Sequence, residues 1–381
     1  MADPIECYAC MTPNKPLSRW TYTPKPLEDH DVEIRIISSG ICHSDLHHMA
    51  AEWSVISWDK KDFPARPTAP FVPGHEIVGE IVAVGAKVSA EHGFVVGQRA
   101  GLGAQAGACG DCGYCSAGDE NLCAKRKSTY ASVWHCDADG KDYQHYGGYA
   151  RRVRTHAAAV VPIPDGMPAR VAAPLMCCGT TTYAPLARFG GLKAGAKVAV
   201  LGIGGLGHMA VRFAAAAGAH VTAVSSSESK RSLALGELGA TAYLNSRDAD
   251  AVAAAADTFD LVISTVSAAI DFGPLLRLTR RRGTFCFLGL PPGSTFPIPK
   301  DVLILKEIRV TGSIIGSRAE MLAMLRFAAD KEAYPITEEF PYDQVNDAVA
   351  RVADNAVRFR AVLRVSEDHP VASPRAKRVK K

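Results

Sequence analysis

Short apolar runs alternate with helical stretches through the second half of the chain. Residues 196–207 read AKVAVLGIGGLG, which predicts a strand followed by a glycine turn. The next residues, HMAVRFAAAAG, predict an alanine-rich helix that ends at Gly218. Apolar segments of the same kind predict further strands at 259–265, 281–290 and 307–317. Alternation with helical stretches such as 226–238 predicts a doubly wound parallel sheet in an α/β fold.

The residues before about 165 have a different pattern, which is β-rich and punctuated by glycines. At 381 residues the chain also exceeds the size at which one hydrophobic core usually keeps growing. We therefore expect two domains, one β-rich and one built on the parallel sheet. The sequence contains no internal repeat.

Composition excludes several classes of partner. The chain has 43 basic and 39 acidic residues, a formal charge of +4, so nothing points to nucleic acid or an acidic membrane. The sequence has neither a signal peptide nor a run long enough to span a bilayer, which favours a soluble, cytoplasmic protein. In a reducing compartment, its 11 cysteines are more typical of free thiols or metal ligands than of disulfides.

Four cysteines lie close together in ACGDCGYCSAGDENLCA, residues 108–124. Thiolates at this spacing can converge on one tetrahedral Zn²⁺ if the loop turns sharply, and its glycines allow such turns. Four protein ligands leave no position for water or substrate, so we expect a structural zinc; a redox pair or an iron–sulfur cluster fits less well. The predicted ligands are Cys109, Cys112, Cys115 and Cys123.

A second set of metal-binding groups is spread along the chain. GICHSDLHHM (40–49), VPGHEIVGE (72–80) and PLMCCGTTTY (174–183) hold thiols, imidazoles and a carboxylate. Each residue alone is more typical of a buried thiol or a core histidine. Two thiolates and one imidazole together form a three-ligand site with a vacant fourth position, which a catalytic zinc requires. The residues alone leave open whether Cys177 or Cys178 is a ligand.

The glycine turn predicts a dinucleotide site, because strand, turn, helix and strand follow one another within about 30 residues. The glycines that let the backbone approach a pyrophosphate are Gly202, Gly204, Gly205 and Gly207. The next strand ends AVSSSESKR, with Ser225 where an NAD enzyme needs a carboxylate and with Lys230 and Arg231 following. This pattern favours NADP(H). The same serines are also typical of a capped helix N-terminus, and both roles can hold at once.

Together these motifs resemble the zinc-containing medium-chain dehydrogenases, and among them the cinnamyl alcohol dehydrogenase group. The likeness runs from about residue 5 to residue 366. It implies a GroES-like catalytic domain over 1–173 and 314–366, with a Rossmann domain over 174–313 inserted. Residues 367–381 remain as a disordered basic tail, or alternatively a nuclear or surface-binding address. The implied activity is that of an NADP(H)-dependent alcohol dehydrogenase or aldehyde reductase, with two Zn²⁺ per chain.

The resemblance assigns roles to residues of the second metal set. The implied catalytic zinc ligands are Cys42, His75 and Cys177. Glu76 would be an alternative ligand, and Asp45 would orient the His75 ring.

The resemblance also assigns a proton relay and the cofactor contacts. Ser44 would pass the alcohol proton through the nicotinamide ribose to His47. The implied cofactor contacts are His43, Thr181, Gly202, Gly204, Gly205, Leu206, Gly207, Ser225, Ser226, Ser227, Lys230, Gly312, Ser313 and Ile314.

Two features depart from the family where substrate would lie. Ser128 and Ser132 stand where the plant enzymes have a pocket tryptophan and an acidic residue. The stretch before His75 is a few residues longer and contains Trp53 and Trp58. We therefore expect a primary alcohol or aldehyde of the cinnamyl or medium-chain type, without assigning cinnamaldehyde itself.

The same sequence leaves two alternative functions open and also predicts a homodimer. A polyol dehydrogenase on this fold and a nucleotide-binding protein without catalysis are the alternatives. Relatives commonly form homodimers through the edge of the Rossmann sheet, and the apolar run TFCFLGL (284–290) followed by PPGS is predicted to supply that edge.

Overall fold

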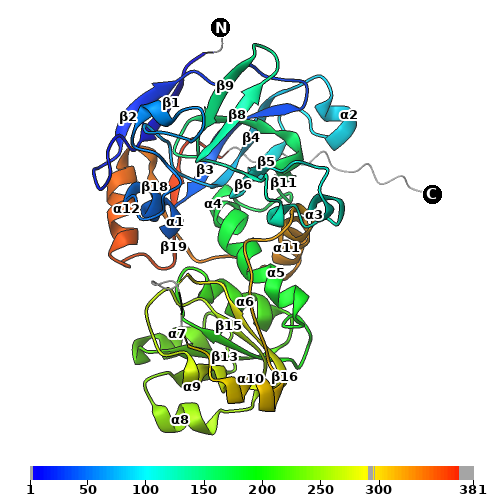
Figure 1. The fold of residues 1–381 in the computed structure, drawn as a ribbon, viewed down its shortest axis with the longest axis vertical. Helices are drawn as coiled ribbons and strands as arrows, with labels where there is room; N and C mark the ends of the chain where they lie inside the picture. Colours follow the sequence, from blue (N-terminus) through cyan, green and yellow to red (C-terminus); the bar gives the residue numbers. More distant parts are fainter. Residues whose placement is uncertain (1–2, 291–294, 296, 369–381) are drawn as a thin grey trace, which may run out of the picture.

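The computed structural model describes residues 3–290, 295 and 297–368, and it has two lobes (Figure 1). The predicted tail therefore lies outside the described residues from residue 369 onward, as does the PPGS segment. None of the helices in the described part of the chain combines the length and the apolar character that a membrane crossing needs.

The upper lobe is built on a seven-stranded sheet. Its strand order is β11-β5-β4-β3-β19-β18, and β10 also pairs with β3. The strands are β3 (Asp31–Gly40), β4 (Glu76–Val84), β5 (Arg99–Leu102), β10 (Arg152–His156), β11 (Val160–Pro162), β18 (Thr337–Pro341) and β19 (Arg360–Arg364). Because β19 pairs with β3, the two ends of the chain meet in one sheet.

Smaller hairpins and short helices surround this sheet. The paired strands are β1 (Ile5–Ala9) with β2 (Ser18–Tyr22), β6 (Gln105–Gly107) with β7 (Lys127–Ser128), and β8 (Ser132–Cys136) with β9 (Lys141–His145). The helices are α1 (His43–Met49), α2 (Val88–His92), α3 (Gly113–Ser116) and α12 (Val345–Ala353). The β-rich character predicted for the first part of the chain is confirmed.

The lower lobe contains a six-stranded parallel sheet with the order β14-β13-β12-β15-β16-β17. Its strands are β12 (Lys197–Leu201), β13 (His220–Ser225), β14 (Ala242–Asn245), β15 (Phe259–Ser264), β16 (Thr279–Phe287) and β17 (Arg309–Gly312). The helices between them are α6 (Gly207–Ala216), α7 (Arg231–Leu235), α8 (Ala249–Ala254), α9 (Gly273–Leu276) and α10 (Lys300–Lys306). The order reverses between β12 and β15, where such sheets bind ligands. The predicted doubly wound parallel sheet is confirmed.

Two details of the sequence prediction are wrong. The run TFCFLGL does not form the edge of the sheet, because β16 pairs with β15 on one side and β17 on the other. The edge strand is β17. The helical stretch predicted over 226–238 is shorter than its bounds: it holds a 3₁₀ turn (Glu228–Lys230) and α7, which ends at Leu235, before Gly236, a residue with low helix propensity.

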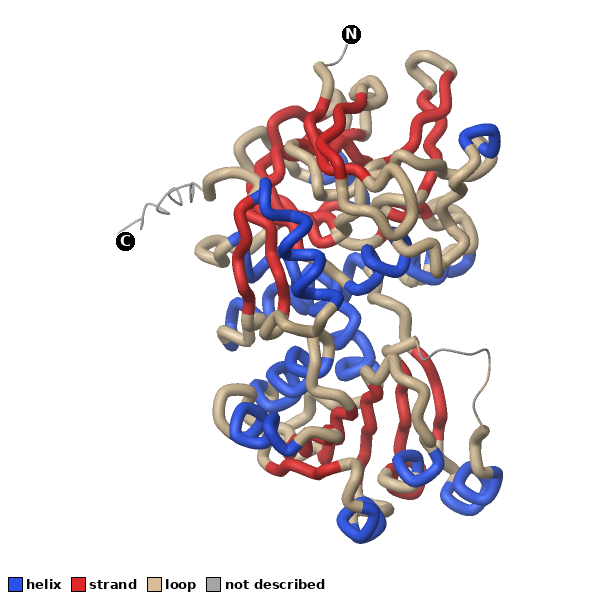
Figure 2. Tube along the Cα trace, turned by 90° about the vertical axis from the view of Figure 1, so that its left-hand side faces the viewer, coloured by secondary structure: helices blue, strands red, loops and turns tan. Residues whose placement is uncertain are grey.

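Helices and one apolar cluster join the lobes, and Figure 2 shows helices between the two sheets. The helices are α4 (Ala169–Pro174), the π-helix η4 (Leu175–Gly179), α5 (Thr180–Arg188) and α11 (Arg318–Lys331). The cluster includes Val78 of the upper sheet, Met176 and Met324 of the connecting helices and Val198 of the lower sheet, all buried. Burial of apolar surface on both sides therefore fixes the connecting helices against both sheets.

Candidate active site, nucleotide pocket and structural metal loop

The four cysteines predicted as ligands between residues 109 and 123 come together in the structure. Their sulfur atoms all lie within 4.8 Å of one another, and the described cysteines form no disulfide. The Sγ distances are 3.4 Å for Cys109–Cys123 and 3.5 Å for Cys112–Cys115. Sulfurs about 3.7 Å apart surround a tetrahedral zinc with Zn–S bonds of about 2.3 Å, so the group fits one zinc ion. Gly110 and Gly118 allow the turns, since both have φ of +79°.

The second set of predicted ligands also converges, although its members lie far apart in the sequence. Ligand atoms of Cys42, His75, Glu76 and Cys177 lie within 4.8 Å of one another. His75 Nε2 is 3.3 Å from Cys177 Sγ. The neighbouring thiol of Cys178 is buried and does not belong to the group. The donor set of two thiols and an imidazole fits a catalytic zinc with room for one exchangeable ligand.

Asp45 fixes the imidazole of this group. Its carboxylate is fully buried and accepts a 3.0 Å hydrogen bond from His75 Nδ1. It also accepts from the backbone N–H of Gly74 at 3.1 Å, from Tyr149 Oη at 3.1 Å and from the Cys42 N–H at 2.9 Å. With Nδ1 protonated toward Asp45, the lone pair of Nε2 faces the two thiols. The bond to Asp45 thereby holds His75 with Nε2 directed at the thiols, as a metal ligand would require.

Glu76 forms a buried ion pair that the sequence did not predict. Arg360 donates a hydrogen bond to Glu76 Oε1 from β19, 284 residues away along the chain. Both side chains are buried, and Glu76 Oε2 has no hydrogen-bond partner among the described residues. Burial, opposed by the positive charge of Arg360, raises the pKa of Glu76 to about 8. One carboxylate oxygen of Glu76 lies within 4.8 Å of the other ligand atoms, so Glu76 fits an alternative ligand.

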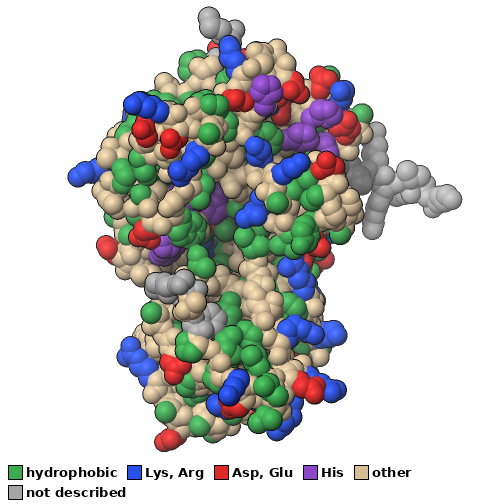
Figure 3. All heavy atoms as spheres, viewed as in Figure 1, with side chains coloured by type: hydrophobic (Ala, Val, Ile, Leu, Met, Phe, Trp, Pro, Cys, Tyr) green, Lys and Arg blue, Asp and Glu red, His purple; other side chains and the backbone are tan. Residues whose placement is uncertain are grey.

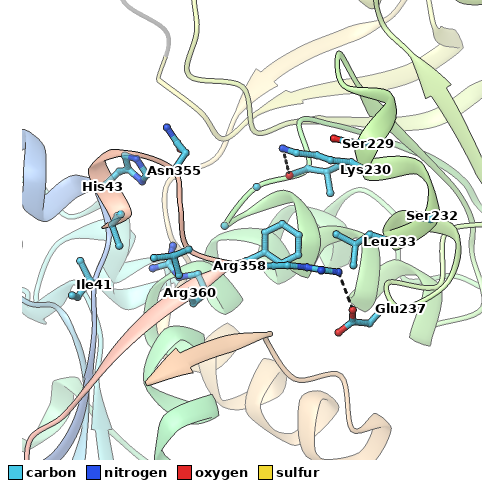
Figure 4. Close-up of a pocket in the computed structure, with 16 residues that line it drawn as sticks. Ile41, His43, Ser229, Lys230, Ser232, Leu233, Glu237, Asn355, Arg358 and Arg360 are labelled. Atoms are coloured by element: carbon cyan, nitrogen blue, oxygen red, sulfur yellow. Dashed lines mark hydrogen bonds and ion pairs between the residues drawn. The ribbon is translucent and has the colours of Figure 1, made fainter. Parts of the chain in front are cut away.

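A cavity of about 540 Å³ lies where the glycine turn meets the upper lobe (Figure 4). Of the predicted cofactor residues, His43, Gly204, Gly205 and Lys230 line it. Lys230 Nζ donates to the carbonyl of Ile203 at 2.8 Å. The sequence did not identify the lining residues that come from the upper lobe, which include Asn355, Val357, Arg358, Phe359 and Arg360.

The other predicted cofactor residues lie outside this cavity. At Gly207 a Cβ atom would lie 1.8 Å from the carbonyl oxygen of Gly202, so the turn requires glycine there. Ser225 is buried at the end of β13, and its Oγ accepts from the Ser227 N–H at 3.3 Å. Thr181 is buried on α5. Leu206 lies next to Gly207, and Ser226 lies next to Ser225. Gly312 ends β17, and Ser313 and Ile314 follow it.

Comparisons with known proteins match this architecture. Two family models match, the alcohol dehydrogenase GroES-like domain over residues 28–165 and the zinc-binding dehydrogenase over residues 205–330. A mannitol dehydrogenase from Petroselinum crispum is 39% identical over 350 residues, which cover 92% of this chain and 98% of that protein. The chain belongs to the zinc-containing alcohol dehydrogenases.

Solved structures of dehydrogenases have the same fold. A cinnamyl alcohol dehydrogenase from Sorghum bicolor has a TM-score of 0.86 and 36% identity, covering 97% of this chain and 100% of that one. The protein called CAD from Helicobacter pylori, complexed with NADP(H), has a TM-score of 0.82 and 29% identity, again covering 97% of this chain and 100% of that one. The α/β fold class and the resemblance to cinnamyl alcohol dehydrogenases are confirmed.

In this dehydrogenase the predicted relay residues, Ser44 and His47, both lie on α1. Ser44 Oγ lies 3.6 Å from Cys42 Sγ, one turn before His47 on α1. The side chain of His47 is 36% exposed, and its Nδ1 lies 2.5 Å from Glu52 Oε2. Figure 3 shows that the surface is hollowed where the lobes meet. Ser44 and His47 lie three residues apart on α1 and therefore share one face of that helix.

The residues that depart from the plant enzymes take different positions in the dehydrogenase. Trp53 stacks on His47 with ring centroids 4.8 Å apart, so the longer stretch contacts α1. Trp58 packs edge-on against Phe71. Ser128 is exposed, whereas Ser132 is buried and donates to the Ser128 carbonyl at 2.6 Å.

Proposed function

We propose that this zinc alcohol dehydrogenase uses NADP(H), binds two Zn²⁺ per chain and acts mainly as a reductase of aldehydes to primary alcohols. The observation that carries the proposal is the convergence of Cys42, His75 and Cys177, with one position left for substrate, beside a cavity lined by the glycine turn. Substrates of the cinnamyl or medium-chain type are the proposed class.

The chain's own side chains hold and orient the reacting groups. Cys42, His75 and Cys177 would hold the catalytic zinc, which would supply a Lewis acid for the substrate oxygen, while bound NADPH would supply the hydride. Ser44 Oγ donates the proton that the product oxygen requires, because a hydroxyl both donates and accepts. His47 replaces that proton from solvent, and Glu52 holds its ring in position.

The preference for NADP(H) rests on the end of β13 and on nearby cations. Ser225 leaves room for a 2′-phosphate that a carboxylate would repel. Lys230 and Arg358 add positive charge at the cavity, although Arg358 lies 3.2 Å from Glu237. The relative from Helicobacter pylori that was solved with NADP(H) supports the same choice.

We also propose a cytoplasmic homodimer. Edge strand β17 pairs only with β16 among the described strands, which leaves one row of its backbone groups for a second copy. Exposed Ile304 and Leu305 on nearby α10 provide apolar surface for the same contact. A light-scattering mass at the monomer value would contradict the dimer.

The test of the activity is the loss of NADPH absorbance with a panel of aromatic and aliphatic aldehydes, repeated with NADH. We expect rapid oxidation of NADPH and slow oxidation of NADH. Cys42→Ala should abolish turnover while leaving NADPH binding intact, whereas Cys178→Ala, which changes the buried thiol outside the metal group, should remain active. Full activity of Cys42→Ala would disprove the mechanism.

A polyol dehydrogenase is the second candidate, because a relative of 39% identity is named mannitol dehydrogenase. Faster oxidation of mannitol or sorbitol than reduction of any aldehyde would favour it. NADPH binding without turnover of either class would instead indicate a binding protein that has lost catalysis.

A further inference from the structure

The four-cysteine loop packs against the segment that leads from the Rossmann sheet back to the upper lobe. This segment, residues 313–317, follows edge strand β17 and precedes α11, whose first turn is capped by Ser317. Its partner is the 3₁₀ turn Glu120–Leu122, which lies inside the loop just before Cys123. The candidate four-cysteine metal site is therefore in direct contact with the connection between the two lobes.

Asn121 makes the central contact. Its side chain is fully buried although it lies between an intermediate Glu120 and a Leu122 that is 42% exposed. Asn121 Nδ2 donates a 3.1 Å hydrogen bond to the carbonyl of Ile314, 193 residues away. Its Oδ1 is buried without a hydrogen-bond partner in the described part of the chain. The amide is therefore held in place by its donor side, through the bond to Ile314.

Glu120 makes a second contact with the same connection. Its Oε1 accepts a hydrogen bond from the backbone N–H of Arg318, at the start of α11. The carbonyl of Glu120 accepts from Gln105 Nε2 at 2.9 Å, which ties the turn to β6. The loop thus contacts the connection at two places, at Ile314 within the segment and at Arg318, the first residue of α11.

The opposite side of the segment rests on α5. At Gly316 a Cβ atom would lie 2.7 Å from Thr180 Cγ2 and 3.1 Å from Ala184 Cβ, so the backbone packs directly on that helix. Ile315 has φ of +39°, an uncommon value for a β-branched residue that surrounding contacts must maintain. The segment is therefore confined between α5 and the four-cysteine loop.

We infer that Asn121 and Glu120 are positioning residues for the nicotinamide end of the cofactor. This inference rests on the proposed function, since it takes Thr181 as the residue near the nicotinamide, as the resemblance implies, and Gly312, Ser313 and Ile314 as contacts of the same cofactor. With the Asn121 bond in place, the carbonyl of Ile314 is fixed relative to Thr181 on α5. The four-cysteine metal site then sets the geometry of hydride transfer as well as the local fold of its loop, because it holds the turn that carries Asn121.

The test is Asn121→Asp, which keeps the shape of the side chain and removes the Nδ2 donor. Leu122→Asp adds the same charge at the exposed neighbouring position and serves as the control. In single-turnover measurements with NADPH, we expect the hydride-transfer rate of Asn121→Asp to fall about 10- to 100-fold, since small misplacements of reacting groups have effects of this size. We also expect an increased kinetic isotope effect with deuterated NADPH, two zinc ions per chain and an unchanged control.

Hydrogen exchange of the 313–318 amides provides a readout that does not depend on turnover. We expect faster exchange there in Asn121→Asp and in Glu120→Ala, which removes the second contact if the first variant folds poorly. Parent-like hydride transfer and exchange in variants that fold would overturn the inference. A parent protein that turns over no substrate would instead overturn the proposed function, and the exchange data would still decide whether the loop holds the segment.

Discussion

Arg360→Met removes the positive charge of a buried ion pair and keeps most of the side-chain volume. In the parent, the Arg360 side chain is 6% exposed and its partner Glu76 is fully buried, between β19 and β4. Breaking a buried pair by removing one partner costs about 3–5 kcal/mol, because the remaining charge stays desolvated. For a lobe of this size, that loss lowers the melting temperature by roughly 6 to 20 °C.

A surface pair provides the matched control. Arg351 Nη2 lies 2.8 Å from Glu338 Oε2, but these side chains are 48% and 30% exposed. Exposed pairs contribute only about 0.2–1 kcal/mol, so Arg351→Met should lower the melting temperature by no more than about 4 °C. Scanning calorimetry of the parent and both variants, all freed of zinc, at pH 8.5 measures the difference.

The pH dependence distinguishes loss of charge from loss of packing. The pKa of Glu76 is raised from 4.5 to about 8 in the folded protein, so between these values the folded state holds a proton that the unfolded state releases. Stability therefore falls as pH rises through this window. Without Arg360 the pKa of Glu76 rises further. The loss of stability of Arg360→Met relative to the parent should therefore be larger at pH 8.5 than at pH 6. A stability loss that becomes smaller between pH 6 and pH 8.5, or one no larger than that of Arg351→Met, would refute this reasoning.

Three further predictions concern the cofactor and the metal loop. Ser225→Asp should lower the ratio of kcat/KM for NADPH over NADH about 10- to 100-fold, because a carboxylate would repel a 2′-phosphate and accept from ribose hydroxyls; an unchanged ratio would contradict the Ser225 assignment. Cys109→Ser should reduce the zinc content from two ions per chain to one, as measured by mass spectrometry, and lower the melting temperature, whereas a full zinc complement would contradict the four-cysteine site. His208 is buried, which lowers its pKa to about 3, and its ring joins the Gly204 carbonyl to the Ile336 N–H. His208→Phe should therefore weaken NADPH binding several-fold in a fluorescence titration, with unchanged affinity as the contrary result.

The features that could be predicted from the sequence are those encoded by neighbouring residues. The spacing of Cys109 to Cys123 and the glycines of 202–207 each place their chemistry within one short segment, and the structure brings each group together there. The parallel sheet follows from alternation of strands and helices, and the structure confirms it. The particular metal and cofactor roles of these residues remain predictions.

Contacts between distant segments could be predicted only where the family resemblance supplied them, as for Cys42, His75 and Cys177. Other distant contacts could not be predicted. Arg360 meets Glu76 across 284 residues, and Asn121 meets Ile314 across 193. Neither arginine nor asparagine has a local pattern that distinguishes a buried partner from an exposed side chain. The same limit explains the error at TFCFLGL, because an apolar strand has the same composition in the interior of a sheet as at its edge.

The two candidate metal sites differ in what must fold before each can form. All four cysteines of the loop lie within 15 residues, so closing that site requires only local turns. The Cys42 group requires α1, the start of β4 and the π-helix η4 to meet, and η4 itself packs into the cluster that joins both lobes. The Cys42 group is thus complete only after the lobes have docked, whereas the four-cysteine group requires only its own loop.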